Sequence, residues 1–284
     1  MFKNELFIIQ IMTYLPEFIF AEIASYLGDS DEGKLIRKYT GNCIVKDIRD
    51  NCTYKNGVLH SYEDQPAKIV KNKKFWYKDG VLHRDGDLPA LIDCNSQTSG
   101  WYRDGKLHRD GDLPAKIVKN KKYWYRDGKL HRDRDLPAIA DENERVYEWY
   151  KEGILHREGD KPAAVDGLRS EWYVEGRLHR DGDLPSLIDG NYKLWYKNGL
   201  RHREGDNPAI IDGLYSSWWR NGRLHREGDK PAVIDDRRKE WYIEGKLHRE
   251  GDLPAVIHRN EEGVNFFWYK NGKIYKPEVV NGCY

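Results

Sequence analysis

The chain has 284 residues, and its 48 lysines and arginines against 47 aspartates and glutamates give a formal net charge of +1 at pH 7. A charge so close to zero argues against a general binder of nucleic acid or anionic membranes, which uses a surplus of basic side chains. Ten tryptophans and nineteen tyrosines are too many for a disordered chain, while a mean hydropathy of −0.87 is low for a thick globular core. The composition favours a thin structure in which aromatic rings cover a sheet.

The first twenty residues are apolar but are interrupted by Glu5, Gln10 and Pro16, and no small-residue cleavage site follows them. We therefore expect no secretory signal, and no segment reaches the ~20 apolar residues of a membrane span. The four cysteines lack metal-type spacing and occupy no repeated position, which indicates reduced, cytosol-type thiols. They are Cys43, Cys52, Cys94 and Cys283.

A helical module is predicted over residues 1–41. Ile19, Ile23 and Leu27 recur every four residues and form one apolar stripe of a helix. Pro16 suits the first helical position, and Gly28 suits the end of the helix.

The spacing Leu-Pro-x-x-Ile-x-x-x-Ile-x-x-x-Leu resembles the start of an F-box, carried here by Leu15, Pro16, Ile19, Ile23 and Leu27. F-box proteins bind the Skp adaptor of cullin ubiquitin ligases and present substrates through a C-terminal repeat domain. The resemblance implies that these five residues bind a host Skp-type adaptor. A plain helical cap over the first repeat stays open as the alternative, and the two roles are compatible.

Histidines reveal an internal repeat that covers residues 42–284. Nine of them are separated by 23 or 25 residues, and nine prolines from Pro66 to Pro254 follow the same intervals. A period in this range indicates stacked supersecondary units, of which we predict about ten. The histidines are His60, His83, His108, His131, His156, His179, His202, His225 and His248.

Each unit contains a strong hairpin signal. An aromatic pair precedes Asn-Gly, Asp-Gly or Glu-Gly, and Leu-His follows, which suits a tight turn that needs positive φ. We therefore predict a mainly β fold, an elongated antiparallel array of β-hairpins with about two strands per unit. Adjacent Trp and Tyr point to opposite faces, and which of them joins Leu and Ile on the apolar face stays open. The ladder that we expect to be structural comprises Trp76, Trp101, Trp124, Trp149, Trp172, Trp195, Trp218, Trp241 and Trp268.

The unit resembles the MORN repeat family, most closely at Tyr125–His131, where Tyr-x-Asp-Gly-Lys-Leu-His matches the family pattern. It departs from that pattern where His-Arg-x-Gly-Asp-x-Pro-Ala replaces His-Gly-x-Gly. In this respect it is more similar to MORN-like proteins of large DNA viruses of amoebae. The resemblance implies a single-layer sheet, a scaffolding, partner-binding or lipid-contacting role, and a location in the host cytoplasm or the virion.

The repeated polar residues are interpreted as structural. Equivalent histidines two strands apart lie ~10 Å from one another, which is too far for them to share one zinc ion. Arg and Asp three residues apart, such as Arg84 and Asp87, are expected to tie turns together by charge-assisted hydrogen bonds. A catalytic constellation occurs once in a chain, so we expect no enzyme, no metal and no cofactor. Arg134, Arg201 and Trp219 depart from the repeat and are interpreted as drift.

These observations together predict a non-catalytic binding or adaptor protein. The repeats would form the surface for a protein partner, and the F-box-like helix would dock on a ubiquitin-ligase adaptor. Two alternatives stay open: a structural scaffold or virion assembly protein that self-associates, and a repeat protein that tethers a membrane.

Overall fold

The computed structural model describes residues 44–47, 52–261 and 263–276. Contacts divide them into two units: unit 1 runs to Arg132 and includes Ala138–Glu142, and unit 2 comprises Asp133–Pro137 and the residues from Asn143 onward. All regular structure in these residues is β, which confirms the predicted mainly β hairpin fold. The predicted helical module, its boundary at residue 41 and its five F-box-like residues lie outside the described residues. Among those described, no helical segment has the length and hydropathy needed to cross a membrane.

Each repeat consists of two hairpins in series. In one repeat of unit 2, β24 (Leu187–Asp189) and β25 (Tyr192–Leu194) form a sheet hairpin, and β26 (Tyr196–Lys197) and β27 (Leu200–Arg201) form a short hairpin. Trp195 separates the two, and its N–H donates to the Ala209 carbonyl of the next repeat at 2.9 Å. The prediction of about two strands per repeat was therefore too low, because the chain bends at Trp195 within a run of β-forming residues.

In unit 1 the sheet hairpins join into an antiparallel sheet in the order β2-β4-β5-β8-β9-β12-β13-β16, with β1 and β3 also paired to β2. The strands are β1 (Ile44–Asp47), β2 (Cys52–Lys55), β3 (Val58–Leu59), β4 (Lys68–Val70), β5 (Lys73–Phe75), β6 (Tyr77–Lys78), β7 (Val81–Leu82), β8 (Leu91–Asp93), β9 (Thr98–Gly100), β10 (Tyr102–Arg103), β11 (Lys106–Leu107), β12 (Lys116–Val118), β13 (Lys121–Tyr123), β14 (Tyr125–Arg126), β15 (Lys129–Leu130) and β16 (Ile139–Asp141).

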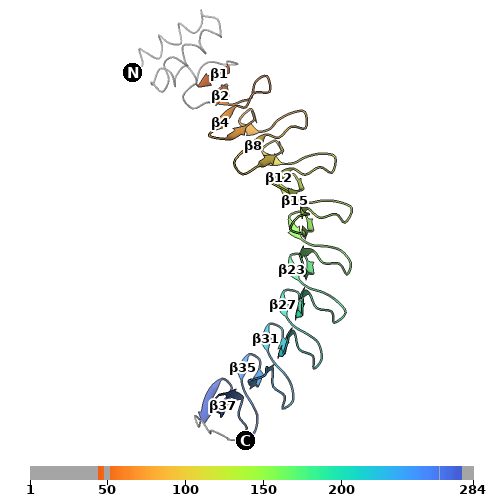
Figure 1. The fold of residues 1–284 in the computed structure, drawn as a ribbon, viewed down its shortest axis with the longest axis vertical. Helices are drawn as coiled ribbons and strands as arrows, with labels where there is room; N and C mark the ends of the chain where they lie inside the picture. The colour runs from red at the N-terminus through yellow and green to blue at the C-terminus, as the bar shows by residue number, and fades with distance from the viewer. Residues whose placement is uncertain (1–43, 48–51, 262, 277–284) are drawn as a thin grey trace, which may run out of the picture. The chain divides into compact units, whose positions relative to one another are not determined.

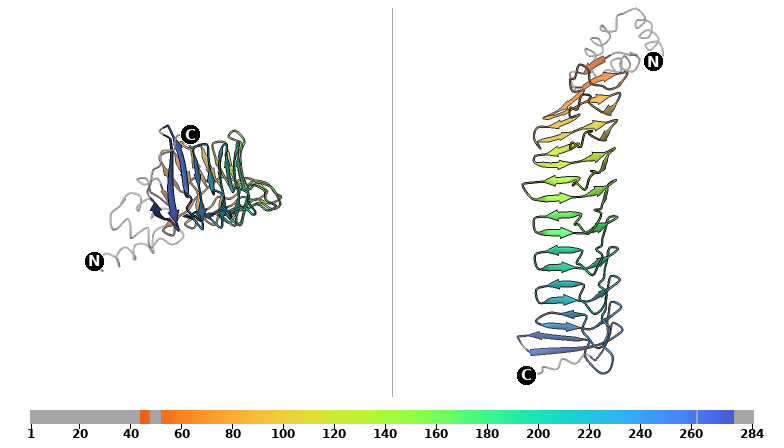
Figure 2. Two further views of the ribbon diagram at one scale, coloured as in Figure 1. Left: turned by 90° about the horizontal axis from the view of Figure 1, so that it is seen from below. Right: turned by 90° about the vertical axis from the view of Figure 1, so that its right-hand side faces the viewer.

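In unit 2 the sheet runs β17-β20-β21-β24-β25-β28-β29-β32-β33-β36-β37-β38. Its other strands are β17 (Val146–Glu148), β18 (Tyr150–Lys151), β19 (Ile154–Leu155), β20 (Ala164–Asp166), β21 (Arg169–Glu171), β22 (Tyr173–Val174), β23 (Arg177–Leu178), β28 (Ile210–Asp212), β29 (Tyr215–Ser217), β30 (Trp219–Arg220), β31 (Arg223–Leu224), β32 (Val233–Ile234), β33 (Arg238–Glu240), β34 (Tyr242–Ile243), β35 (Lys246–Leu247), β36 (Val256–Asn260), β37 (Gly263–Lys270) and β38 (Lys273–Lys276). Within each unit the hairpins follow one another in chain order (Figures 1 and 2).

The short hairpins turn at the predicted dipeptides. Asn198 has a φ of 51° and Gly199 a φ of 80°, and the other Asn-Gly, Asp-Gly and Glu-Gly turns repeat this pair of positive values. Two positive φ angles in a two-residue loop define a type I′ turn. The turn glycine also links successive repeats, because Gly199 N–H donates to the Leu178 carbonyl at 2.9 Å.

Trp and Tyr of each aromatic pair are buried on different sides. In unit 2, Tyr192, Tyr196 and Tyr215 pack against a cluster of Leu187, Leu194 and Ile210 on the sheet. Tyr therefore shares the apolar face with Leu and Ile, while Trp lies under the loop that follows the short hairpin. The alanine after each loop proline is fully buried, which explains why only Ser186 replaces it; the alanines are Ala67, Ala90, Ala115, Ala138, Ala163, Ala209, Ala232 and Ala255.

Candidate functional site

The loop after each short hairpin, here called the connecting loop, carries an arginine that joins two repeats. The guanidinium of Arg203 lies 3.9 Å from the ring centre of Trp195 in its own repeat. Its Nε and Nη2 donate to the two carboxylate oxygens of Asp183, in the preceding loop, at 2.8 and 3.0 Å. Nη1 donates to the Pro208 carbonyl at 3.1 Å. Ring face, carboxylate and carbonyl thus hold one planar cation in place.

This arrangement recurs in eight repeats, and a lysine takes the same place in the last. Lys276 pairs with Asp252 at 2.6 Å and lies 6.0 Å from the ring centre of Trp268. The charge-assisted hydrogen bonds expected of Arg84 and Asp87 do tie loops together, because Arg84 binds Asp64 of the preceding loop and Asp87 binds Arg109 of the following one. The sequence leaves the partner ambiguous, since each arginine has an aspartate in its own loop and in the preceding one. The stacked arginines are Arg84, Arg109, Arg132, Arg157, Arg180, Arg203, Arg226 and Arg249.

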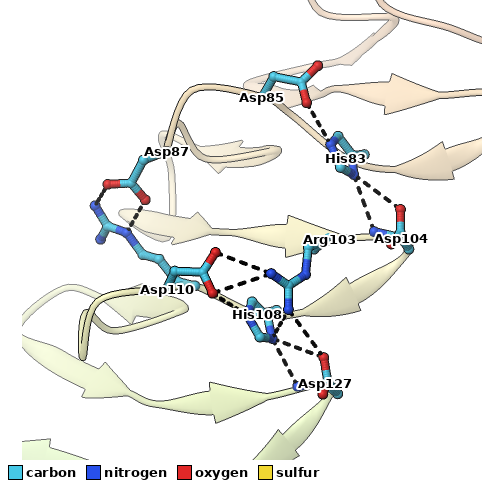
Figure 3. Close-up of polar contacts among 9 residues, drawn as sticks. His83, Asp85, Asp87, Arg103, Asp104, His108, Asp110 and Asp127 are labelled. Carbon is cyan, nitrogen blue, oxygen red and sulfur yellow. Dashed lines mark hydrogen bonds and ion pairs between the residues drawn. The ribbon is translucent and has the colours of Figure 1, made fainter.

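The histidines form a second set of links between repeats (Figure 3). Nδ1 of His83 accepts the backbone N–H of Asp104 in the next turn at 3.3 Å, and its Nε2 lies 2.9 Å from a carboxylate oxygen of Asp85. His108 repeats this with Asp127 and Asp110. Because Nδ1 accepts, the neutral ring carries its proton on Nε2. Among the described residues, no group of three or more His, Cys, Asp or Glu is placed to hold a metal ion.

Eight connecting loops fall into two classes, which the sequence interpretation missed, and the first loop, which carries Asp64, belongs to neither. The loop aspartate is the residue that binds the arginine or lysine of the next repeat, as Asp87 binds Arg109. Two residues before it, Asp-type loops have Asp and Glu-type loops have Glu. The Asp-type loops are Asp85–Pro89, Asp110–Pro114, Asp133–Pro137 and Asp181–Pro185; the Glu-type loops are Glu158–Pro162, Glu204–Pro208, Glu227–Pro231 and Glu250–Pro254. The sequence shows the two loop classes as Asp or Glu at the first position of the loop.

The two classes differ in backbone, and three of the four tryptophans that face Glu-type loops also lack the indole hydrogen bond made in the Asp-type class. In the Asp-type loop, Asp112 has a φ of 57°, and its carbonyl accepts the indole N–H of Trp124 at 3.0 Å. The loop aspartates of the Glu-type class do not adopt positive φ. Within the described residues, the indole nitrogens of Trp172 and Trp218, which face Glu-type loops, have no hydrogen-bond partner although they are buried. The Trp241 indole nitrogen is likewise buried without a partner among these residues, whereas that of Trp268, which also faces a Glu-type loop, donates to the Asp252 carbonyl at 3.4 Å.

Glu-type loops border pockets between consecutive repeats of unit 2. The pocket at Trp218, of about 500 Å³, lies between the loop Glu204–Pro208 and the following loop, and its lining includes His202, His225 and Lys230. A smaller pocket of about 280 Å³ lies at Trp172. Extra cations accompany these loops: Lys230 binds the same Asp206 carboxylate as Arg226, and hydrogen bonds from the two hold the pKa of Asp206 well below its usual range.

Two residues interpreted as independent drift lie together. The guanidinium of Arg201 is 4.4 Å from the ring centre of Trp219 and donates to the Tyr196 hydroxyl at 3.1 Å. The Trp219 indole donates to the fully buried Ser217 at 2.8 Å. The larger ring at the usual Tyr position therefore covers the cation that replaces Leu, and the two changes are coupled. Arg134, at a turn glycine position, adopts a φ of 62°.

No protein-family model matches this sequence, and no curated protein matches it either.

Proposed function

We propose that this chain is a non-catalytic binding protein whose repeats hold a protein partner and whose F-box-like segment docks on a host Skp-type ubiquitin-ligase adaptor. One observation carries the proposal: the arginine, aspartate, tryptophan and histidine of the repeats recur in the same contacts between neighbours. Such a framework resembles that of repeat proteins, in which each unit contacts only its neighbours and the surface is left for recognition.

The exposed positions on this framework vary from repeat to repeat, as a recognition surface requires. At the tips of three consecutive sheet hairpins of unit 2, Leu168 and Leu214 are 84% and 77% exposed, and Asn191 stands at the equivalent place between them. Large apolar side chains presented singly to solvent supply contact area for a partner without collapsing onto the sheet. We propose that the bound protein is the substrate that the F-box-like segment brings to the ligase.

The test is co-purification of a Skp-type adaptor with the full chain and with the variant Ile19→Glu/Ile23→Glu. Burying one such side chain is worth ~1.5–3 kcal/mol, so loss of two should weaken a micromolar interface at least a hundredfold. Leu214→Glu is the matched control, because it places the same charge on an exposed repeat tip and should leave adaptor binding unchanged.

Equal retention of the adaptor by the wild type and the double variant, or no retention by either, would overturn the ligase role. The scaffold role would then be measured as self-association in sedimentation, and the tethering role as binding to vesicles of anionic lipid.

A further inference from the structure

We propose that Arg201, in the short hairpin of β26 and β27, binds an acidic side chain of a partner polypeptide. This deepens the proposed function, on which it rests, by naming a point on the repeats where the partner is held and the charge that the partner supplies. The arginine occurs once at this position. The other repeats have leucine there: Leu59, Leu82, Leu107, Leu130, Leu155, Leu178, Leu224 and Leu247.

Arg201 is the exception among the partly buried arginines. Each of the eight arginines that stack on a tryptophan also binds an aspartate carboxylate, as Arg203 binds Asp183 at 2.8 Å. The partly buried Arg220 and Arg238 bind carboxylates as well. Arg201 is also partly buried, yet it makes no ion pair with any residue that the structure describes. A partly buried cation without a counter-ion has an uncompensated desolvation cost, which an anion from outside the chain would offset.

Two aromatic rings hold this guanidinium in place. Its Cζ lies 4.4 Å from the ring centre of Trp219 and 5.5 Å from that of Tyr196, and Nη2 donates to the Tyr196 hydroxyl at 3.1 Å. The Trp219 ring is itself fixed, because its indole N–H donates to the fully buried Ser217 at 2.8 Å. A cation that is already held in position loses little conformational entropy when it binds a partner.

The part of the Arg201 guanidinium that carries Nη1 is open to a partner. Nε is buried without a hydrogen bond and cannot be reached. Nη1 has no hydrogen bond within the described part of the chain either, but it is not buried. The Tyr196 hydroxyl accepts from Nη2 and keeps its own proton, which has no acceptor among the described residues. Because Nη1 and Nη2 belong to one planar group and the hydroxyl lies 3.1 Å from Nη2, these donors are close enough to bind one acceptor group.

The charge and the neighbouring repeats select a carboxylate. One uncompensated positive charge is neutralised by one carboxylate, whereas a phosphate group with a charge of about −1.5 to −2 requires more than one cation. In three other repeats a glutamate precedes the tryptophan, and the Tyr150 hydroxyl donates to Glu148 at 2.7 Å. Leu194 stands at that place in the repeat of Arg201, so the carboxylate that accompanies the tyrosine elsewhere is missing from the chain here. The partner's acidic side chain would supply it.

The test is NMR of the arginine ¹³Cζ and ¹⁵Nε resonances of the full chain, titrated with acetate at constant ionic strength. The Arg201 resonances, assigned by their loss in Arg201→Leu/Trp219→Tyr, should shift in a saturable way. Arg203 should not respond, because it already binds Asp183. The exposed Arg177 serves as a free guanidinium, and half-saturation of Arg201 should come at about tenfold less acetate. Neutral acetamide should have no effect, and inorganic phosphate should bind more weakly than acetate.

The matched variant is Leu194→Glu, which supplies within the chain the carboxylate that Glu148, Glu171 and Glu240 supply in their repeats. Its Arg201 resonances should lie at the acetate-bound position from the start and no longer respond, while the other arginine resonances report an intact fold. Leu194→Gln, of the same size without the charge, should keep the response to acetate.

The variant Arg201→Leu/Trp219→Tyr restores the residues of the other repeats, so it should fold and melt no lower than the wild type, because it removes an unpaired cation. A lower melting temperature of this variant would make Arg201 a structural residue and overturn the proposal. Arg201 resonances that ignore acetate, or that respond as strongly to acetamide or phosphate, would also overturn it. Because adaptor co-purification reads the N-terminal segment, either result can fail without the other.

Discussion

Trp124 in unit 1 and Trp218 in unit 2 occupy the same position in their repeats, and both are 8% exposed. Arg132 and Arg226 cover them at 3.8 and 3.6 Å from the ring centres. The indole of Trp124 binds the Asp112 carbonyl, whereas that of Trp218 has no partner among the described residues. The arginine contacts therefore do not depend on the loop class, and the loop backbone can vary while the link between repeats is kept.

The largest expected effect is loss of the shared arginine. Arg226→Ala removes the stacking on Trp218 and leaves the Asp206 carboxylate with Lys230 alone, and Arg132→Ala does the equivalent beside Trp124. Asp206 is 46% exposed, so we expect a loss of about 2–3 kcal/mol, below the ~3–5 kcal/mol of a fully buried pair. Denaturant unfolding should give similar losses for both variants. The exposed Arg177→Ala is the control, and a loss confined to one repeat class would contradict a common framework.

A larger side chain at the buried alanine after the loop proline tests the same contacts between repeats. Ala138 and Ala232 are fully buried, and their carbonyls accept the backbone N–H of Trp124 and Trp218 at 2.8 Å. Substitution by leucine should destabilise each repeat by about 1–3 kcal/mol through overpacking. Alanine to serine should be tolerated because Ser186 already fills this place, and thermal melting of the four variants provides the comparison.

Lowering the pH should destabilise the protein through the aspartates that bind two cations. Hydrogen bonds from Arg157 and Lys161 lower the pKa of Asp135 to about 2, and those from Arg226 and Lys230 lower the pKa of Asp206. Because the folded pKa lies below the unfolded value of ~3.9, this stabilisation is complete above that pH and is lost as the pH falls toward 2. Carboxyl titration by NMR should show the pKa of Asp206 rising in Lys230→Leu. An unchanged pKa of Asp206 would show that Lys230 does not lower it.

The smallest expected effect on stability comes from the indole hydrogen bond that Trp124 makes and Trp218 does not. Glu204→Asp/Asn207→Leu should give Trp218 the hydrogen bond that Trp124 has, and we expect a gain of up to about 1 kcal/mol in stability. The reverse exchange, Asp110→Glu/Leu113→Asn, should free the Trp124 indole and lose a similar amount. Equal stabilities in both directions would show that the loop class does not control the indole bond.

Much of the fold could be predicted because it follows from local chemistry. Asn198-Gly199 specifies a type I′ turn, and Pro208 breaks the strand pattern. The second hairpin in each repeat was missed because Trp195, itself a strand former, marks the bend through contacts with the next repeat. The pocket at Trp218 lies between two consecutive connecting loops, and a one-dimensional pattern does not show how far apart these loops lie.

The arginine of each repeat always binds an aspartate in the loop before it, 20 or 22 residues earlier in the chain. Removing or duplicating one whole period would therefore give every remaining arginine an equivalent aspartate at an equivalent distance. The two extra residues of the longer periods fall at the tips of sheet hairpins, outside these contacts. Whole periods can thus be added to or removed from the array while each remaining arginine keeps an equivalent contact.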